Sequence, residues 1–284
     1  MESNTKIYSS NAKINIGLRI LGKRPDGYHD IETVFQEVDL HDTISMTPAM
    51  DGIEITCSHP DLPTDERNLA YKAAALVKKT YSVSSGIQIF IEKRIPFGAG
   101  LGGGSSNAAV VLKGLSAIWN LAIPKIELNA LALQLGSDVP FFLEGGVALA
   151  HGRGEIITKV KSFPNFICLL VYPNIEISTK WSYKNYNLFL TKTKKNVKLG
   201  GSFLKSIKLR EFRDVFHNDL EGIAFRHYPV LGKIKQQLFH YNAEFALMSG
   251  SGSTVYGLFD SETEAQKAKG EFDSLFHTFL TYPV

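Results

Sequence analysis

The chain has little cysteine, little net charge and no long apolar run. Of its 284 residues only two are cysteines, Cys57 and Cys168, and they lack the spacing of a metal site. Without a disulfide framework, we expect a reduced, cytoplasmic protein. Cys168 lies within the apolar run 166–172, so we expect it in the core rather than at a reactive site.

Further absences narrow the class of protein. The formal net charge of +3 is too small to predict a nucleic-acid partner. Residues 1–5 are polar and lack the apolar stretch of a signal peptide, and no apolar run predicts a membrane span. We interpret the lysine-rich stretch 192–195 as a solvated loop. These features predict a cytoplasmic protein with neither a nucleic-acid nor a membrane partner.

The remaining composition is that of an ordinary globular protein, with 44% hydrophobic and 21% charged residues. Apolar periodicity predicts strands over 13–21, 31–38, 53–57, 87–92, 166–172, 246–248 and 254–259. It predicts helices over 68–79, 105–119, 126–135, 230–239 and 261–271. Strands and helices mix without strict alternation, which predicts an α+β fold. We place a boundary within 152–164, giving domains 1–157 and 158–284.

Glycine is abundant in one short stretch. Residues 96–107 read Pro-Phe-Gly-Ala-Gly-Leu-Gly-Gly-Gly-Ser-Ser-Asn. Glycine is favoured where the backbone approaches a ligand or adopts a positive φ. A predicted strand precedes the stretch and a predicted helix follows it, for which Ser105, Ser106 or Asn107 can supply the N-cap. A strand, a glycine loop and a helix N-terminus together favour the binding of phosphate.

Several interpretations of this loop compete. Residues 98–103 match the dinucleotide fingerprint G-x-G-x-x-G, which expects an acidic residue about 20 positions later. Glu127 is the nearest one. A P-loop requires a lysine where Gly104 stands. A flexible linker fits poorly, because Phe97 and Leu101 interrupt the glycines.

A fourth interpretation rests on a resemblance. The pattern Pro-x3-Gly-Leu-(Gly)n-Ser-Ser-x-Ala over residues 96–108 resembles the phosphate loop of the GHMP kinases, the small-molecule kinases of galactose, homoserine and mevalonate type. Further motifs follow in the expected order: Ala12-Lys-Ile-Asn-Ile-Gly-Leu18, Arg24-Pro-Asp-Gly-Tyr-His29, Gly136-Ser-Asp-Val-Pro-Phe-Phe142 and Ser249-Gly-Ser-Gly-Ser253. The Asp-Gly-Tyr-His motif resembles the one found in the branch of this family that acts on CDP-methylerythritol. The resemblance is weakest over 184–213.

The resemblance implies an ATP-dependent phosphotransferase with an alcohol acceptor. Its implied reaction is phosphorylation of the 2-hydroxyl of CDP-methylerythritol in non-mevalonate isoprenoid precursor biosynthesis. The implied fold has a ribosomal-protein-like N-terminal domain and a ferredoxin-like C-terminal domain, with the active site between them, in a monomer or homodimer. The alternatives are another GHMP kinase, a dinucleotide-dependent oxidoreductase and a non-catalytic phosphate-binding module.

Asp138 and Lys13 are the candidate catalytic residues. Asp138 precedes an apolar run, where a carboxylate either has a partner or caps a helix that begins at Val139. Lys13 and Asn15 share one face of an alternating segment, which an ordinary solvated strand also explains. The resemblance implies that Asp138 is the base at the accepting hydroxyl. It also implies that Lys13 pairs with Asp138 and keeps it ionised.

The resemblance implies two sets of binding residues. The implied ATP-binding residues are Pro96, Phe97, Gly98, Ala99, Gly100, Leu101, Gly102, Gly103, Gly104, Ser105, Ser106 and Asn107. The implied substrate-binding residues are Asn15, Tyr28, His29, Phe35, Thr179, Tyr183, Gly250, Ser251 and Gly252. No cluster has protein-metal spacing, so we expect Mg²⁺ to arrive with ATP, with Ser105 and Ser106 as candidate ligands.

Five of the substrate residues lie in two motifs with simple local interpretations. Asp26-Gly-Tyr-His29 predicts a turn, and residues 249–253 predict a turn between paired strands. The resemblance implies that Tyr28 stacks on a cytosine, that His29 bonds its polar edge, and that Tyr183 is a further wall. Trp181 is the rival for that last position. The second glycine loop would then face the substrate diphosphate or the transferred phosphate.

Overall fold

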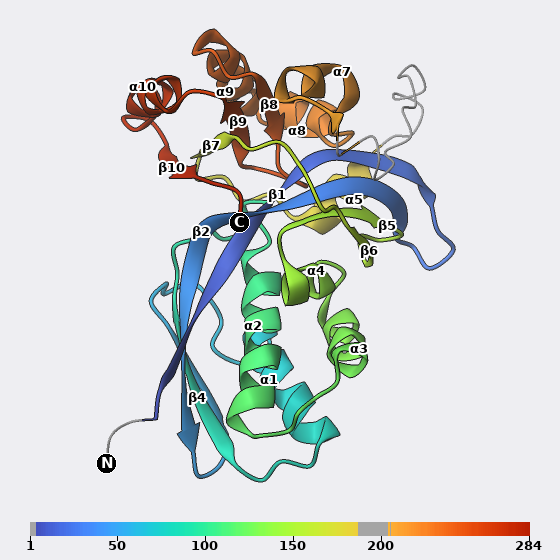
Figure 1. The fold of residues 1–284 in the computed structure, drawn as a ribbon, viewed down its shortest axis with the longest axis vertical. Coiled ribbons are helices and arrows are strands. Elements are labelled where there is room, and N and C mark those ends of the chain that lie inside the picture. Colours follow the sequence, from blue (N-terminus) through green and yellow to red (C-terminus); the bar gives the residue numbers. More distant parts are fainter. Residues whose placement is uncertain (1–3, 187–203, 205) are drawn as a thin grey trace. The chain divides into compact units, whose positions relative to one another are not determined.

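The computed structural model describes residues 4–186, 204 and 206–284. The chain packs into two compact units that alternate along the sequence. Unit 1 comprises Met1–Ala12, Leu40–Ile95 and Gly102–Gly145, and unit 2 comprises Lys13–Asp39, Pro96–Leu101 and Gly146–Val284. The long strands β1 (Lys6–Lys23) and β2 (His29–Ala49), both blue in Figure 1, therefore contribute residues to each unit. The boundary that we place after residue 157 stays a prediction.

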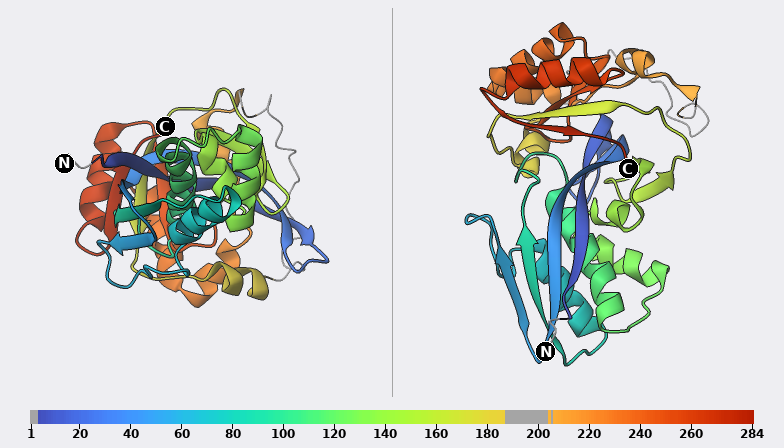
Figure 2. Two further views of the ribbon diagram at one scale, coloured as in Figure 1. Left: turned by 90° about the horizontal axis from the view of Figure 1, so that it is seen from below. Right: turned by 60° about the vertical axis from the view of Figure 1, so that its left-hand side comes forward.

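Unit 1 combines a sheet with a layer of helices. Its helices are α1 (Leu69–Thr80), α2 (Gly103–Ile118), α3 (Lys125–Leu135) and α4 (Val139–Glu144). Strand β4 (Gly86–Glu92) is antiparallel to residues 43–49 of β2 and parallel to β3 (Ile53–Cys57). The right-hand view of Figure 2 shows these helices gathered on one side of the strands. Alternate isoleucines of β4 are buried, as the period of two predicts: Ile87, Ile89 and Ile91.

Unit 2 contains a second set of strands, which pairs with the N-terminal part of β2. Strand β5 (Val147–His151) is antiparallel to residues 33–36 of β2, and β6 (Ile156–Lys159) is antiparallel to β5. The predicted turn between β1 and β2 forms, with Gly27 at φ 85°. The Asp26 carboxylate accepts the Tyr28 N–H, and the Arg24 side chain binds both Asp26 and Asp30. These bonds give the Asp-Gly-Tyr-His segment a defined conformation.

The rest of unit 2 contains a four-stranded antiparallel sheet in the order β10-β7-β9-β8. Its strands are β7 (Ile167–Tyr172), β8 (Phe245–Met248), β9 (Val255–Phe259) and β10 (His277–Thr281). Its helices are α5 (Thr179–Asn185), α7 (Phe212–Val215), α8 (Glu221–His227), α9 (Pro229–His240) and α10 (Glu262–Phe272). In Figure 1, α9 and α10 lie beside this sheet, which they also contact. The order of strands and helices is ferredoxin-like, which confirms the predicted fold class.

The core of unit 2 forms where α9 and α10 meet this sheet. Leu231, Ile234 and Leu238 follow the helical spacing along α9 and are fully buried. Cys168 on β7 is also fully buried, and burial raises the pKa of its thiol well above the usual value. Cys168 is therefore a core residue, as its apolar run predicts, and its thiol is not activated.

Most predicted helices and strands are confirmed, but β1 and β2 are longer than predicted, and the predicted N-cap of α2 is wrong. Gly102, not a serine or asparagine, is the N-cap residue of α2, with φ 72° and no side-chain cap bond. The helix thus begins at Gly103, and Ser105, Ser106 and Asn107 lie inside it. Glycine adopts the left-handed conformation readily, so the loop can end at Gly102 and the helix begins before the polar residues at 105–107. The lysine-rich stretch 192–195 lies outside the described residues.

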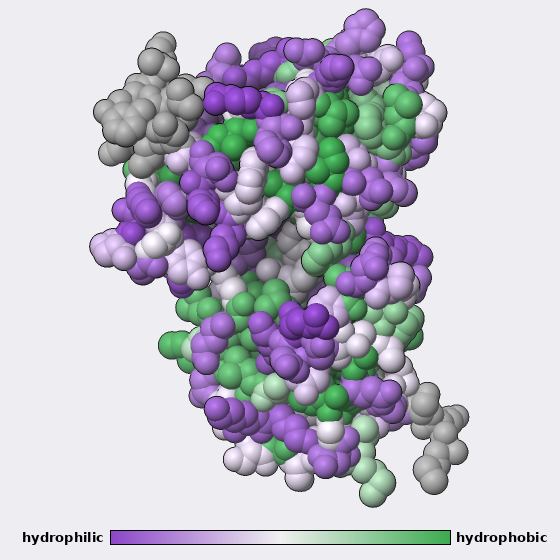
Figure 3. All heavy atoms as spheres, turned by 180° about the vertical axis from the view of Figure 1, so that it is seen from behind, coloured by the Kyte–Doolittle hydropathy of each residue, from purple (hydrophilic) through white to green (hydrophobic). Residues whose placement is uncertain are grey.

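The exposed large apolar residues are scattered over several elements rather than gathered in one segment: Ile7, Met50, Phe90, Ile126, Leu133, Ile156 and Leu275 are among them. On the face drawn in Figure 3, hydrophilic residues separate the hydrophobic ones. Among the described residues, no helix has both the length and the apolar character needed to span a membrane.

Candidate active site

The carbonyl of Gly100 joins three segments of unit 2. It accepts hydrogen bonds from Lys13 Nζ at 3.2 Å and from Ser249 Oγ at 2.9 Å. Ser249 Oγ also accepts the Asn15 N–H at 3.3 Å. These bonds hold β1, the first glycine loop and the second glycine loop together. Gly100 has φ 77°, and a Cβ at this position would lie 2.2 Å from the Ser249 carbonyl oxygen, so only glycine fits.

Lys13 and Asn15 are buried on the strand face that the alternating pattern assigns to both. Only 4% of Lys13 and 2% of Asn15 is exposed, so this face is not the solvated one of the alternative interpretation. Lys13 Nζ donates to Asn15 Oδ1, and Asn15 Nδ2 donates to Thr33 Oγ1 at 2.9 Å. The ammonium also lies 5.2 Å from the centre of the Phe35 ring. Phe35 is only 1% exposed and thus supports Lys13 from below the surface.

The second glycine loop, residues 249–253, lies against the same side chains. A Cβ on Gly250 would be 3.1 Å from Asn15 Oδ1 and 3.6 Å from Lys13 Nζ. The hydroxyls of Thr179 and Ser251 are hydrogen bonded at 3.0 Å, so α5 also reaches this loop. The loop connects the paired strands β8 and β9, as predicted. The structure therefore brings together Lys13, Asn15, Gly100, Thr179, Gly250 and Ser251.

Asn218 anchors the second loop from below. Its amide nitrogen donates to the carbonyls of Met248 at 2.8 Å and Gly250 at 2.7 Å, and the residue is buried. Its side-chain oxygen accepts the Leu220 N–H at 2.9 Å. Sequence reasoning missed Asn218 and assigned no role to Ser249, although Ser249 opens the second glycine motif. Asn218 lies in the polar stretch His217-Asn-Asp219, which gives no local signal, whereas a serine that opens a glycine loop was the signal at Ser249.

His29 and Tyr183 stack on each other. Their ring centroids are 5.2 Å apart with an angle of 27° between the planes. Trp181, the rival in α5, packs instead on His227 and Tyr228. The geometry therefore brings Tyr183, rather than Trp181, to His29.

Tyr28 lies in the turn between β1 and β2, next to His29, and 54% of the residue is exposed. The Arg153 guanidinium lies 4.8 Å from the centre of its ring. Arg153 in turn forms an ion pair with Glu155 at 3.5 Å. Part of the Tyr28 ring therefore remains available to a planar ligand. Sequence reasoning missed Arg153, because the packing of a cation on a distant ring leaves no local pattern.

The second half of the first glycine loop begins α2 in unit 1. The first turn of this 16-residue helix has no side-chain cap and no acidic residue. A helix start of this kind leaves backbone N–H groups and the positive end of the dipole for an anion. Gly104 has open space, since a Cβ there would meet only Leu69 at 3.7 Å. The geometry agrees with the phosphate-binding interpretation.

A buried carboxylate that sequence reasoning missed lies beside this helix start. Asp42 is fully buried and binds Lys93, Asn107 and the N–H groups of Arg94 and Ile95. A signal was present, because Asp42 shares the buried face of β2 with Ile44 and Met46. A carboxylate in such a position requires partners.

Asp138 occupies the N-cap position of α4, where the alternative interpretation places it, but its side chain makes no cap hydrogen bond. Helix α4 starts with Val139 and Pro140, as the preference for proline in the first turn predicts. Capping therefore does not account for the carboxylate of Asp138.

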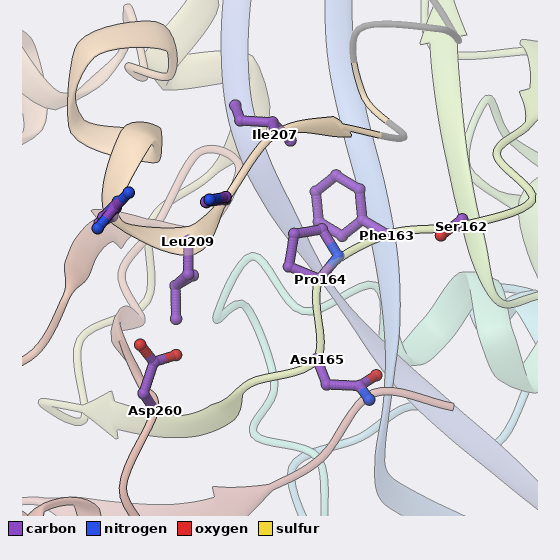
Figure 4. Close-up of a pocket in the computed structure, with 9 residues that line it drawn as sticks. Ser162, Phe163, Pro164, Asn165, Ile207, Leu209 and Asp260 are labelled. Atoms are coloured by element: carbon purple, nitrogen blue, oxygen red, sulfur yellow. The ribbon is translucent and has the colours of Figure 1, made fainter.

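In the part of the chain that the structure describes, neither a group of metal ligands nor a pocket adds a residue to the candidate site. Among the described residues, no group of three or more His, Cys, Asp or Glu could hold a metal ion. A pocket of about 470 Å³ in unit 2 is lined by residues 162–165, residues 207–210 and Asp260. Figure 4 shows Phe163 and Pro164 on one side of it and Leu209 and Asp260 on another. None of the predicted site residues lines this pocket.

Comparison with known proteins identifies the family. Residues 68–146 match the GHMP kinases N terminal domain and residues 202–278 match the GHMP kinases C terminal domain. A 4-diphosphocytidyl-2-C-methyl-D-erythritol kinase of Chlorobium phaeobacteroides (strain BS1) is 42% identical over 96% of this chain and 95% of its own. One from Clostridium botulinum (strain Eklund 17B / Type B) is 43% identical over 93% of each chain.

A solved structure agrees with these relatives. The crystal structure of a 4-(cytidine 5'-diphospho)-2C-methyl-D-erythritol kinase has a TM-score of 0.83 and 32% identity, covering 98% of this chain and 99% of that one. The chain belongs to the GHMP kinase family and, within it, to the 4-diphosphocytidyl-2-C-methyl-D-erythritol kinases. It is thus a phosphotransferase with an alcohol acceptor, and the oxidoreductase and non-catalytic alternatives are not favoured.

The pKa of His29 provides a test of the turn geometry. Burial of the ring lowers this pKa below its usual value of 6.5, and the nearby charge of Lys23 lowers it further. His29 should therefore be neutral at pH 7. Because the unfolded chain binds the proton more tightly, His29 should reduce the stability of the fold as the pH falls through 6.5. We expect an NMR titration to give a pKa below 6.5 and Lys23→Gln to raise it.

Lys267→Gln on α10 is the matched control for this charge change and should leave the His29 titration unchanged. A His29 pKa at or above 6.5 in the wild-type protein would contradict the packing of this ring.

Proposed function

We propose that this enzyme transfers the γ-phosphoryl group of ATP to the 2-hydroxyl of 4-diphosphocytidyl-2-C-methyl-D-erythritol, in the non-mevalonate synthesis of isoprenoid precursors. The observation that supports this most strongly is the 42% identity over 96% of the chain to a kinase named for that substrate. The site geometry agrees, since stacked rings and two glycine loops suit a ligand with both a base and phosphates.

We propose that Asp138 and Lys13 carry the chemistry. The acceptor hydroxyl loses its proton to the Asp138 carboxylate as its oxygen bonds to the γ-phosphorus, and the bond from that phosphorus to the β,γ-bridging oxygen breaks to release ADP. Lys13 supplies positive charge at the reacting groups, held in place by Asn15, Gly100 and the Phe35 ring. Phosphoryl transfer depends mainly on such positioning and charge neutralisation.

For ATP we propose the first glycine loop and the start of α2. Backbone N–H groups at Gly103, Gly104 and Ser105 suit the phosphate oxygens. We propose that Mg²⁺ accompanies ATP, bound mostly through phosphate oxygens and water. Ser105 is the better placed of the two candidate serine ligands, because Ser106 is buried and its hydroxyl accepts a bond from Ser10 at 2.8 Å.

For the cytidine we propose the turn of Tyr28 and His29, with Tyr183 behind it. The base stacks on Tyr28, and His29 recognises its polar edge while Tyr183 fixes the His29 ring. Thr179, Gly250, Ser251 and Gly252 are proposed to bind the diphosphate or the phosphoryl group in transfer.

A substrate assay with one side-chain variant tests the proposed reaction. Coupled ADP release should be rapid with CDP-methylerythritol and near background with mevalonate and homoserine. Tyr28→Ala should raise the KM for CDP-methylerythritol by about 10- to 100-fold, since stacking of one base contributes about 1–3 kcal/mol. The KM for ATP should stay constant. The matched control is Phe90→Ala, which removes another exposed ring on β4. Equal turnover of mevalonate would overturn the substrate assignment.

Single and double substitutions test the catalytic pair. Asp138→Asn should lower kcat by about 10²–10⁴, the range for a lost general base, and ATP binding should persist. Lys13→Ala should have an effect of similar size. The double variant should be little worse than either single one, because groups that act as a unit are not additive. Asp61→Asn is the control for the charge change. Near-normal turnover in either single variant would remove that residue from the mechanism.

A glycine substitution tests the ATP loop. Gly104→Ala fits the fold, since its Cβ makes only ordinary contact with Leu69. Alanine should stabilise α2 by up to about 1 kcal/mol. A methyl group should nevertheless hinder the approach of phosphate to the backbone, and we expect the calorimetric Kd for ATP to rise about tenfold or more, as when a bond to a charged group is lost.

Gly222→Ala in α8 is the control, because it adds a methyl group in open space within another helix. If Gly104→Ala binds ATP normally, the phosphates do not approach this part of the loop.

A further inference from the structure

Two segments of unit 1 meet at the Asp42 carboxylate. Oδ1 accepts the backbone N–H groups of Arg94 at 2.8 Å and Ile95 at 2.9 Å. These residues lead directly into the first glycine loop. Oδ2 accepts Asn107 Nδ2 at 2.9 Å and is bonded to Lys93 Nζ. Since Asn107 lies in the first turns of α2, one side chain binds both ends of the loop.

The bonds continue through neighbouring polar side chains. Asn107 Nδ2 also donates to Ser10 Oγ at 2.9 Å, and Ser10 donates to Ser106 Oγ at 2.8 Å. Strand β1 is thereby connected to the same turn of α2. Ser10, Asp42, Ser106 and Asn107 are all buried, so each bond is shielded from water and each lost partner is costly.

The negative charge of Asp42 is compensated by an adjacent positive charge. The Lys93 side chain is largely buried and forms an ion pair with Asp42. A bare carboxylate beside an anion site would repel the phosphates of a nucleotide. The ion pair of Asp42 and Lys93 instead has no net charge, and the four hydrogen bonds to Asp42 have fixed directions. Its contribution is therefore geometric rather than an attraction for ATP.

We propose that Asp42 is a positioning residue for nucleotide binding, which fixes residues 94–95 and Asn107 so that the helix start at Gly102–Ser105 is held ready for phosphate. This inference rests on the proposed ATP site. A loop that is ordered only part of the time weakens the observed affinity in proportion to the competent fraction. Loss of Asp42 should thus act on ATP binding, without a direct contact between Asp42 and the ligand.

Asp42→Asn is the informative change. An asparagine keeps one acceptor oxygen but turns an NH₂ group toward the donors of Lys93 and Asn107. We expect the calorimetric Kd for ATP to rise about tenfold or more, with the KM for CDP-methylerythritol changed by less than about twofold. Hydrogen exchange at the Arg94 and Ile95 amides should accelerate. Val77→Ala, a buried truncation in α1, is the control for general loss of stability in unit 1 and should retain ATP affinity.

Lys93→Met and the double variant Asp42→Asn/Lys93→Met separate positioning from the effect of an unpaired buried ammonium. The double variant should bind ATP more weakly than Lys93→Met alone. If the double variant and Lys93→Met have the same Kd for ATP, Asp42 does not position the loop. The same conclusion follows if Asp42→Asn and Val77→Ala have equal melting temperatures and Asp42→Asn binds ATP no more weakly than Val77→Ala. ATP binding by the wild type with no turnover of CDP-methylerythritol would instead fault the proposed substrate and leave this test intact. Failure of the wild type to bind ATP would overturn both.

Discussion

The geometry of the candidate site depends on one backbone carbonyl, that of Gly100. Two donors converge on it, the Lys13 ammonium and the Ser249 hydroxyl. Because the acceptor belongs to the backbone, its position follows from the path of the loop, and that path requires a left-handed residue without a Cβ. Lys13, the candidate catalytic lysine on β1, and Ser249 on the second loop are thus placed relative to each other by a glycine that carries no functional group.

Buried polar bonds, rather than apolar packing, hold the candidate residues of each unit in place. In unit 2 the chain of bonds runs from Lys13 through Asn15 to Thr33 and on to the Gly17 carbonyl. In unit 1 it runs from Lys93 through Asp42 and Asn107 to Ser10. Such networks impose direction as well as proximity, because each donor must meet its own acceptor. Apolar contacts alone would leave the lysine ammonium free to change rotamer.

Much of the fold could be predicted from the sequence, because periodicity is a local property. The paired strands β8 and β9 and the helix α9 follow the apolar spacing within a few residues. Strands β1 and β2 extend well beyond their predicted bounds, since polar residues such as Ser10 and Asp42 interrupt the apolar pattern while staying buried. A buried charge looks like a loop or surface residue until its partner is known.

The site was predictable only where a residue carries its signal in its own motif. The glycine loops, Lys13 and the Asp-Gly-Tyr-His turn have such motifs, whereas Asn218 and Arg153 act through residues far away in the chain. The choice between Tyr183 and Trp181 shows the same limit. Both are aromatic residues of α5, and only the three-dimensional structure reveals that Tyr183 meets His29.

The first glycine loop lacks the lysine that a P-loop places before its serine, and in the proposed ATP site the start of α2 supplies positive charge instead. Helix α2 offers an uncapped first turn with no acidic side chain, so its dipole and N–H groups are not offset by nearby negative charge. The Asp42 carboxylate, which is bound beside it, is paired with Lys93. A neutral, rigid support therefore leaves the partial positive charge of the helix start for the ligand. In the proposed site, affinity for phosphate then depends on how well the backbone is held, and a buried carboxylate thereby contributes to the binding of an anion.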